Sequence, residues 1–314
     1  MRRILCNHSP NDAPARKTNI EQHRNLVTTA ASASSLGFVL VRLATFNLLH
    51  GRSLSDGTVH ADRVRAAIAD LDADVLGLQE VDRAQPRSGL LDLTEIAAEA
   101  MGAPAHRFAA AIAGTPGESW QPWRSDDDNV HPLYGIALVS RYPVTRWQIT
   151  ALPGAPVRSP VYTGDHGFRL LKDEPRVLLA AVLETPLGPL TVATTHLSFV
   201  PGWNLRQLRH AVRHLRSLPG PRVLLGDLNM PTVPVRVVTG WKPLGKAPTF
   251  PSPSPRAQLD HILADPHGVS RLGRVVQVCT PHPPVSDHRP LIVQLDADTR
   301  PPGRRSGPTA HRSS

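Results

Sequence analysis

Polar side chains of a kind that can do chemistry stand at the ends of apolar, strand-like runs in this chain of 314 residues. The clearest example is PRVLLGDLNMP (221–231), in which an apolar run leads to Asp227 and Asn229. Alternate side chains of a strand share one face, so this carboxylate and this carboxamide are expected to point the same way from the edge of a core. The spacing therefore predicts a functional site at the end of this strand.

The same arrangement recurs along the chain. Each residue alone has a structural explanation, and a lone histidine is weak evidence in a chain with 15 of them. Acids, amides and imidazoles are, however, the groups that hold cations and transfer protons. The ordered set predicts that distant segments converge on one pole of the fold. Its other members are Asn47 (RLATFN), Glu80 (VLGLQE), His196 (VATTH), Asp260 (QLDH), and Asp287 with His288 (SDH).

Seven blocks of sequence, taken in order, resemble the endonuclease/exonuclease/phosphatase superfamily of metal-dependent phosphoesterases. This superfamily includes pancreatic-type deoxyribonucleases, abasic-site endonucleases, neutral sphingomyelinases and inositol-phosphate phosphatases. The resemblance covers nearly all of residues 41–297. The blocks are ATFNLLHG, DVLGLQEVD, YGIALVSRYPV, TTHLS, LLGDLNMP, QLDHIL and SDHRPLIV.

The resemblance implies a divalent metal site. Glu80 resembles the principal metal-binding glutamate of the family, with Asn47 beside it and Asp287 as a further ligand. Mg²⁺ suits one or two carboxylates plus phosphate oxygens of the substrate, and Mn²⁺ could substitute. Zinc is disfavoured, because the chain has neither an HExxH motif nor clustered Cys and His.

The resemblance also implies the catalytic roles. His288 corresponds to the general base and Asp260 to the aspartate that orients it. Asp227 matches a residue that positions or activates the attacking water or contacts the metal, and these alternatives stay open. Asn229 would donate to a phosphate oxygen, and His196 would stabilise developing charge or protonate the leaving group. Abasic-site endonucleases lack this last histidine, which disfavours abasic-site repair.

Some features depart from the family pattern or stay unassigned. Ile136 stands where many bacterial relatives carry Asn, and no carboxylate partner for His196 is identified. The acids at 126–128 lie in a plausible loop, but a run of three acids is usually solvated. His261 should face away from its neighbour in the strand and is interpreted as structural.

Many strands and few helices predict an α+β fold, a four-layer α/β/β/α sandwich of two packed mixed β-sheets flanked by helices. Segments 113–133 and 152–175 are predicted to be loops that influence substrate choice. Helices are predicted at 60–71, 93–101 and 204–218. Strands are predicted at 42–47, 74–81, 134–140, 176–184, 189–197, 222–228, 258–264, 274–279 and 290–295.

Charge and composition set the domain limits and the class of partner. The net charge is +9, but residues 1–40 and 298–314 each contribute +3, which leaves +3 for residues 41–297. We expect a disordered or misassigned extension at 1–40, one domain at 41–297 and a disordered basic tail at 298–314. The arginines of 204–218 are interpreted as a solvated helix surface rather than a nucleic-acid contact. Two cysteines and no membrane-spanning segment favour a cytoplasmic protein, expected to be a monomer.

The leading hypothesis is a Mg²⁺-dependent phosphoesterase, and within that class a phosphodiesterase acting by in-line attack of water. The modest core charge places a small or lipid-derived phosphoester ahead of DNA or RNA, so a nuclease is the first alternative. The others are a non-catalytic module that binds a phosphorylated ligand, and a basic nucleic-acid binder that acts through its tails.

Overall fold

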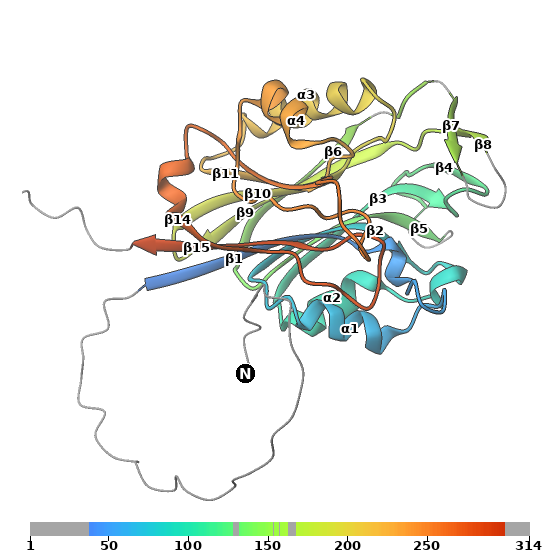
Figure 1. The fold of residues 1–314 in the computed structure, drawn as a ribbon, viewed down its shortest axis with the longest axis horizontal. Helices are drawn as coiled ribbons and strands as arrows, with labels where there is room; N and C mark the ends of the chain where they lie inside the picture. The colour runs from blue at the N-terminus through green and yellow to red at the C-terminus, as the bar shows by residue number, and fades with distance from the viewer. Residues whose placement is uncertain (1–37, 128–131, 153, 157, 163–167, 299–314) are drawn as a thin grey trace, which may run out of the picture.

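The structure is a computed structural model, and it describes residues 38–127, 132–152, 154–156, 158–162 and 168–298. The predicted extension at 1–40 and tail at 298–314 lie outside these ranges, apart from Phe38–Leu40 and Asp298. Two mixed sheets pack face to face, and a pair of helices covers the outer face of each (Figure 1). The predicted four-layer sandwich is confirmed.

The first sheet has seven strands in the order β14-β15-β1-β2-β5-β3-β4. Only the pair β1 and β2 is parallel, and the other neighbours are antiparallel. Its strands are β14 (Arg274–Cys279), β15 (Leu291–Asp298), β1 (Phe38–Asn47), β2 (Val75–Arg83), β5 (Leu133–Ser140), β3 (Ala105–Gly114) and β4 (Trp120–Pro122).

The second sheet has six strands in the order β12-β13-β11-β10-β9-β6, and again one pair, β10 and β11, is parallel. A separate hairpin pairs β7 (Arg158–Tyr162) with β8 (Phe168–Lys172). The strands of the sheet are β12 (Lys242–Pro243), β13 (Asp260–Ala264), β11 (Arg222–Asp227), β10 (Gly188–His196), β9 (Arg176–Thr185) and β6 (Val144–Leu152).

Four α-helices form the outer layers of the described fold (Figure 1). Helices α1 (Ala61–Ala69) and α2 (Leu93–Met101) pack on the first sheet, and α3 (Trp203–Leu215) and α4 (Thr232–Thr239) pack on the second. The apolar side chains of α3 recur at intervals of three and four residues, which places them on one face toward the sheet. Short 3-10 helices lie at Leu49–Gly51, Pro86–Ser88 and Val269–Leu272.

All nine predicted strands and all three predicted helices are present, with ends shifted by a few residues. The prediction of loops at 113–133 and 152–175 was wrong in part, because these segments contain β4 and the β7–β8 hairpin. Strands β3 and β6 and helix α4 were not predicted. The core half of β3 is rich in alanine, which has weak strand propensity. Helix α4 contains β-branched residues and Pro234, which is tolerated because it lies in the first turn.

The two parallel pairs lie opposite each other across the interior, and a glycine lets them approach. Gly77 in β2 faces Thr194 of β10 and Leu225 of β11, and a Cβ atom at this position would lie 2.7 Å from the Thr194 hydroxyl oxygen. Because β1, β2, β10 and β11 end at the same pole, their terminal side chains meet there. This geometry brings segments far apart in the sequence to one site.

Candidate active site

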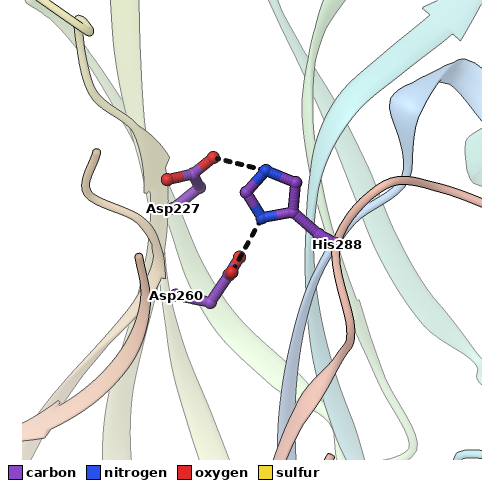
Figure 2. A group of neighbouring side chains, drawn as sticks. All are labelled: Asp227, Asp260 and His288. Atoms are coloured by element: carbon purple, nitrogen blue, oxygen red, sulfur yellow. Dashed lines mark hydrogen bonds and ion pairs between the residues drawn. The ribbon is translucent and has the colours of Figure 1, made fainter. Parts of the chain in front are cut away.

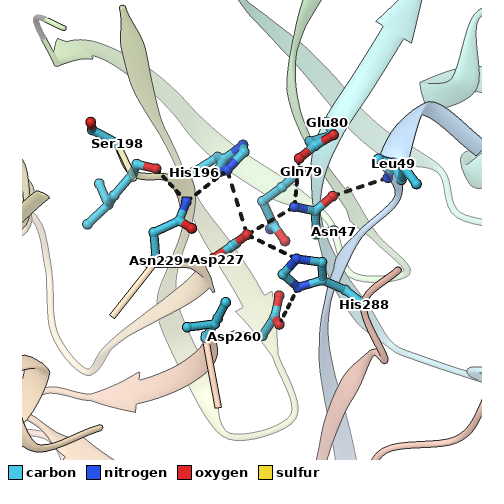
Figure 3. A network of polar contacts seen from close by, with 12 residues as sticks. Asn47, Leu49, Gln79, Glu80, His196, Ser198, Asp227, Asn229, Asp260 and His288 are labelled. Carbon is cyan, nitrogen blue, oxygen red and sulfur yellow. Dashed lines mark hydrogen bonds and ion pairs between the residues drawn. The ribbon is translucent and has the colours of Figure 1, made fainter. Parts of the chain in front are cut away.

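Polar side chains from both sheets meet at the carboxyl ends of the two parallel pairs (Figure 3). Asn47 ends β1 and Glu80 lies in β2, while His196 and Asp227 end β10 and β11. Asp260 begins β13. His288 comes from the segment that precedes β15. The structure therefore places the predicted polar residues at one pole.

Asn47 joins the two sheets through its amide group. Its Nδ2 atom donates to Glu80 Oε1 at 3.0 Å and to Asp227 Oδ2 at 3.0 Å. Its Oδ1 atom accepts from the backbone N–H of Leu49 at 3.1 Å. Both amide hydrogens and the amide oxygen have partners, so the side chain is fixed between two carboxylates.

Glu80 is held in an unusual backbone conformation. Its φ angle is +52°, and the register of β2 against β5 shifts between Leu78 and Val81. A bulge of this kind re-aims a side chain, here toward the site pole. Burial raises the pKa of Glu80 to about 7, and the charges of Asp287 and Asp227 add to the effect. A carboxylate crowded by other carboxylates favours a bound cation.

His288 lies between two aspartates (Figure 2). Its Nδ1 atom is 2.8 Å from Asp260 Oδ2, and its Nε2 atom is 3.7 Å from Asp227 Oδ2. Burial disfavours a charge on the ring, but the charges of these two acids outweigh it and raise the pKa of His288 to about 10. Burial also raises the pKa of Asp227 to about 6. The Asp260 carboxylate fixes the orientation of the ring and directs Nε2 toward Asp227.

His196 has a cationic partner at one ring nitrogen and a carboxylate near the other. An Arg176 guanidinium nitrogen lies 3.2 Å from His196 Nδ1. Burial and this positive charge hold the pKa of His196 well below its usual value, so the ring is neutral. Because a guanidinium can only donate, Nδ1 accepts and the ring proton resides on Nε2. This nitrogen is 3.6 Å from Asp227 Oδ2.

Asn229 lies beside His196 in a turn that follows β11. Its φ angle is +50°, a conformation that asparagine adopts more readily than most residues. Its backbone N–H donates to Asp227 Oδ1 at 2.9 Å, which stabilises the turn. Its Nδ2 atom donates to Leu197 O at 2.9 Å. The same atom lies 3.2 Å from His196 Nε2, and with the ring proton on Nε2 this is a contact between two N–H donors and not a hydrogen bond. Both side chains lie at the site (Figure 3), but the prediction that strand alternation places them there was wrong, because β11 ends at Asp227 and a turn positions Asn229.

Two groups of side chains are candidates for holding a metal ion. The first is the predicted oxygen set of Asn47, Glu80 and Asp287, in which the Asp287 charge raises the pKa of Glu80. The second consists of Asp227, Asp260 and His288, whose potential ligand atoms lie within 4.8 Å of one another. In this second group His288 Nδ1 is already hydrogen-bonded to Asp260. The oxygen donors of the first set are those preferred by a hard cation.

The site opens into a pocket of about 840 Å³. Its lining includes residues that the sequence did not single out. Arg176 was part of a predicted strand, and its charge at the start of an apolar run was the available signal. The other additional lining residues include Trp120, Tyr134, Lys172, Glu174 and Phe199.

Residues flagged as departures from the family pattern lie outside the site. Ile136 is buried in the core between the sheets. Asp127 is also buried and accepts from Gln121 Nε2 and from the backbone N–H of Arg124, so it stabilises its own loop, unlike the solvated acid expected. Asp128 lies outside the described residues. His261 is buried and bonds to Met230 O, in agreement with a structural role.

Comparisons with known proteins agree with this geometry. The sequence profile of the Endonuclease/Exonuclease/phosphatase family matches residues 44–288. No curated protein matches the chain. Among solved structures, an endonuclease/exonuclease/phosphatase from Beutenbergia cavernae is 23% identical, with a TM-score of 0.60, over 82% of this chain and 72% of that one.

Two further similar structures belong to proteins whose names state an enzyme activity. One is a mannosyl-6-phosphatase from Bacteroides thetaiotaomicron, with 17% identity and a TM-score of 0.51, covering 81% of this chain and 98% of that one. The other is sphingomyelinase C from Streptomyces griseocarneus, with 17% identity and a TM-score of 0.51, covering 82% of this chain and 99% of that one. At these identities the likeness shows a shared fold.

Proposed function

Because this chain belongs to the Endonuclease/Exonuclease/phosphatase family, we propose that it is a Mg²⁺-dependent phosphodiesterase of small or lipid-derived phosphoesters. The observation that carries the proposal is the continuous polar chain at the site pole. It runs from Glu80 through Asn47 to Asp227, which faces His288. Such a set combines cation ligands with a positioned proton acceptor.

The metal would be held by Glu80, with Asn47 and Asp287 beside it. When bound there, a Mg²⁺ ion would neutralise phosphate charge and offset the field of the carboxylates that holds a proton on His288. The nearby Asp260 Oδ1 atom has no hydrogen-bond partner among the described residues. The site is therefore rich in negative charge that a cation would balance.

Each of the protein groups has a separate role in hydrolysis. A water molecule oriented by Asp227 attacks phosphorus and gives its proton to Nε2 of His288. Asp260 holds Nδ1, so in the neutral ring Nε2 is the nitrogen that accepts that proton. The bond between phosphorus and the leaving oxygen breaks on the opposite side.

His196 and Asn229 act on the phosphate. Since the His196 proton resides on Nε2, the neutral ring can donate a hydrogen bond to a phosphate or leaving oxygen. Asn229 supplies an amide hydrogen from the neighbouring turn. Both groups are positioned by contacts already present in the protein, so little rearrangement is needed as charge develops.

The pocket supports a small substrate or a lipid head group. A volume of about 840 Å³ is in the range of small-molecule sites. The mannosyl-6-phosphatase and the sphingomyelinase with the same fold have names that indicate substrates of this size. A nuclease and a phospho-ligand-binding module are the alternatives that the experiment must distinguish.

The test is hydrolysis by the purified protein with Mg²⁺ and after chelation. The panel contains a generic diester, sphingomyelin, inositol phosphates, a mannose 6-phosphate derivative, and nicked and abasic DNA. His288→Ala should reduce turnover by about 10² to 10⁴-fold. His106→Ala is the control, because His106 also pairs with a carboxylate, Glu95, at 2.9 Å on the outer surface.

The outcomes separate the candidate functions. Metal-dependent hydrolysis of a small ester that His288→Ala abolishes supports the proposal. Preferential cleavage of DNA would identify a nuclease instead. Binding of phosphorylated ligands without turnover, with or without Mg²⁺, would identify a binding module.

A further inference from the structure

The outer layer formed by α3 and α4 is strongly basic. Between Ser198 and Gln258 the sequence contains nine Lys and Arg residues and a single acid, Asp227, so this segment carries +8. The remainder of residues 41–297 therefore carries −5. Asp227 is buried in the active site and Arg222 is paired with Asp265, so the other charged side chains of this segment are all positive. The net charge of the domain conceals this separation.

The arginines of α3 form a stripe on its exposed side. Arg206, Arg209, Arg213 and Arg216 follow one another at intervals of three and four residues, and all four are exposed. Within the described part of the chain, no carboxylate pairs with any of them. Arg216 donates to Thr239 O at the end of α4, so the stripe runs alongside that helix. The two helices lie together over the second sheet (Figure 1).

Helix α4 adds apolar side chains to this basic surface. Val233 and Val237 are one turn apart, and their exposed fractions are 71% and 80%. Arg236 shares their face. These three side chains line a groove of about 630 Å³ together with Lys242 and Lys246. Exposed valine side chains have an unfavourable solvation free energy in water. Another surface that covers them removes this cost.

We propose that the α3–α4 face docks on an anionic lipid bilayer. Lys and Arg are attracted to acidic head groups, and aliphatic side chains enter the boundary between head groups and acyl chains. A nucleic acid would use the cations, but its phosphate backbone offers no partner for the two valines. The combination of charge and exposed aliphatic area therefore favours a lipid surface. None of these side chains belongs to the proposed catalytic machinery, so this inference stands apart from the proposed function.

The experiment is cosedimentation of the full-length protein with lipid vesicles. The probes are phosphatidylcholine vesicles with and without about 30 mol% phosphatidylglycerol. We expect binding to the anionic vesicles and at least about tenfold weaker binding to the neutral ones. Val233→Ser/Val237→Ser and Arg236→Glu/Lys242→Glu should each weaken binding to anionic vesicles by about tenfold.

A matched variant and a competitor complete the design. Val275→Ser/Val276→Ser changes two exposed valines on β14, far along the other sheet, and should bind vesicles normally. Circular dichroism and thermal unfolding check that each variant is folded. Failure of the wild-type protein to bind anionic vesicles would overturn the proposal. It would also be overturned if the Val233→Ser/Val237→Ser variant bound normally while duplex DNA displaced the vesicles, because the face would then be a general polyanion site.

Discussion

At the scale of single residues, the contact with Arg176 determines the tautomer of His196. The guanidinium is buried, and its ion-pair contacts with Asp173 and Glu174 are long, at 3.8 and 3.9 Å. Its Nε atom has no hydrogen-bond partner in the described structure. The positive charge is thus only partly neutralised, and it keeps the His196 ring neutral with its proton directed at the pocket.

Removal of this cation should change the titration of His196. In Arg176→Met the pKa of His196 should rise but stay below its usual value, because burial, the larger cause of its lowering, remains and only the positive charge is removed. Turnover should fall about tenfold or more, since the ring loses its preferred tautomer. Arg176→Lys keeps the charge and is the control. NMR titration of the imidazole distinguishes this role from simple packing, because a structural role alone would leave the His196 tautomer unchanged.

His50 offers a test of acid stability outside the catalytic set. Burial lowers the pKa of His50 to about 3, and the charges of Arg87 and Arg52 contribute. The folded protein therefore binds fewer protons here than the unfolded chain between pH 6.5 and 3, and this site loses stability as the pH falls through that window. The loss is at most about 1.4 kcal/mol per pH unit, and less because the ring is partly exposed.

The variant His50→Asn should remove this loss. Asparagine tolerates the φ angle of +46° at this position, so the backbone need not change. Urea unfolding at pH 7 and pH 5 should show a smaller fall in unfolding free energy for the variant than for the wild type. Equal falls in the two proteins would show that His50 is not kept neutral by the fold.

The residues of the site were predictable because their chemistry and spacing were visible together. Asp227 and Asn229 stand two residues apart at the end of an apolar run, and the SDH block carries its own signature. Arg176 was not singled out, because a charge at the start of a strand is usually solvated. Its burial depends on how β9 packs beside β10, which one sequence does not encode locally. The carboxylate near His196 that the sequence left unidentified is Asp227, 3.6 Å from Nε2, and Arg176 occupies the other ring nitrogen.

At the scale of elements, the distance between the two sheets sets the geometry of the site. Gly77 has no side chain at the point where β2 meets β10 and β11. Gln79 Nε2 donates across the same interface to Thr194 Oγ1 at 2.9 Å, and Glu80 follows directly in the chain. A change in sheet separation would therefore move a proposed metal ligand.

Gly77→Ala should destabilise the protein and reduce its activity. The new Cβ atom would lie 2.7 Å from Thr194 Oγ1 and 3.2 Å from Leu225 Cβ, so the sheets must separate. Overpacking of this kind costs about 1–3 kcal/mol in unfolding free energy, measurable by urea denaturation. Thr194→Ala removes the nearest atom but leaves Cβ of residue 194 at 2.9 Å, so Gly77→Ala should cost less unfolding free energy in the Thr194→Ala background than in the wild type, without becoming neutral. Strict additivity of the two changes would show that this contact is not the cause.

Helices and strands with a strong periodic pattern of apolar residues were predicted from the sequence. Strands whose formation depends on pairing with a neighbouring strand were not. The apolar strands β1, β2, β10 and β11 are buried between layers, and their sequences show it. Strand β6 lies at a sheet edge, where burial is incomplete and the pattern weaker. The β7–β8 hairpin is paired only with itself, so its formation reflects local pairing rather than a core signal.

At the scale of the whole molecule, the distribution of charge matters more than its sum. The modest +3 of residues 41–297 was correctly counted but conceals the basic α3–α4 layer. Its arginines were interpreted as solvated, and the structure shows that they are exposed along one stripe. The fold, and not the sequence pattern, places these arginines on the same side of the molecule as Val233 and Val237. Among the described residues, no helix is long and apolar enough to cross a bilayer.

The two terminal strands define how much of the chain the fold needs. Strands β1 and β15 pair from Phe38 opposite Asp298 to Thr45 opposite Leu291. A chain of residues 38–298 should therefore keep its hydrolytic activity within about twofold and its melting temperature within about 2 °C of the full chain. A chain of residues 41–297, the limits expected from sequence, cuts into this ladder and should melt lower. If the 38–298 chain were folded but inactive, residues beyond the terminal strands would take part in function, as the hypothesis of a tail-mediated nucleic-acid binder requires.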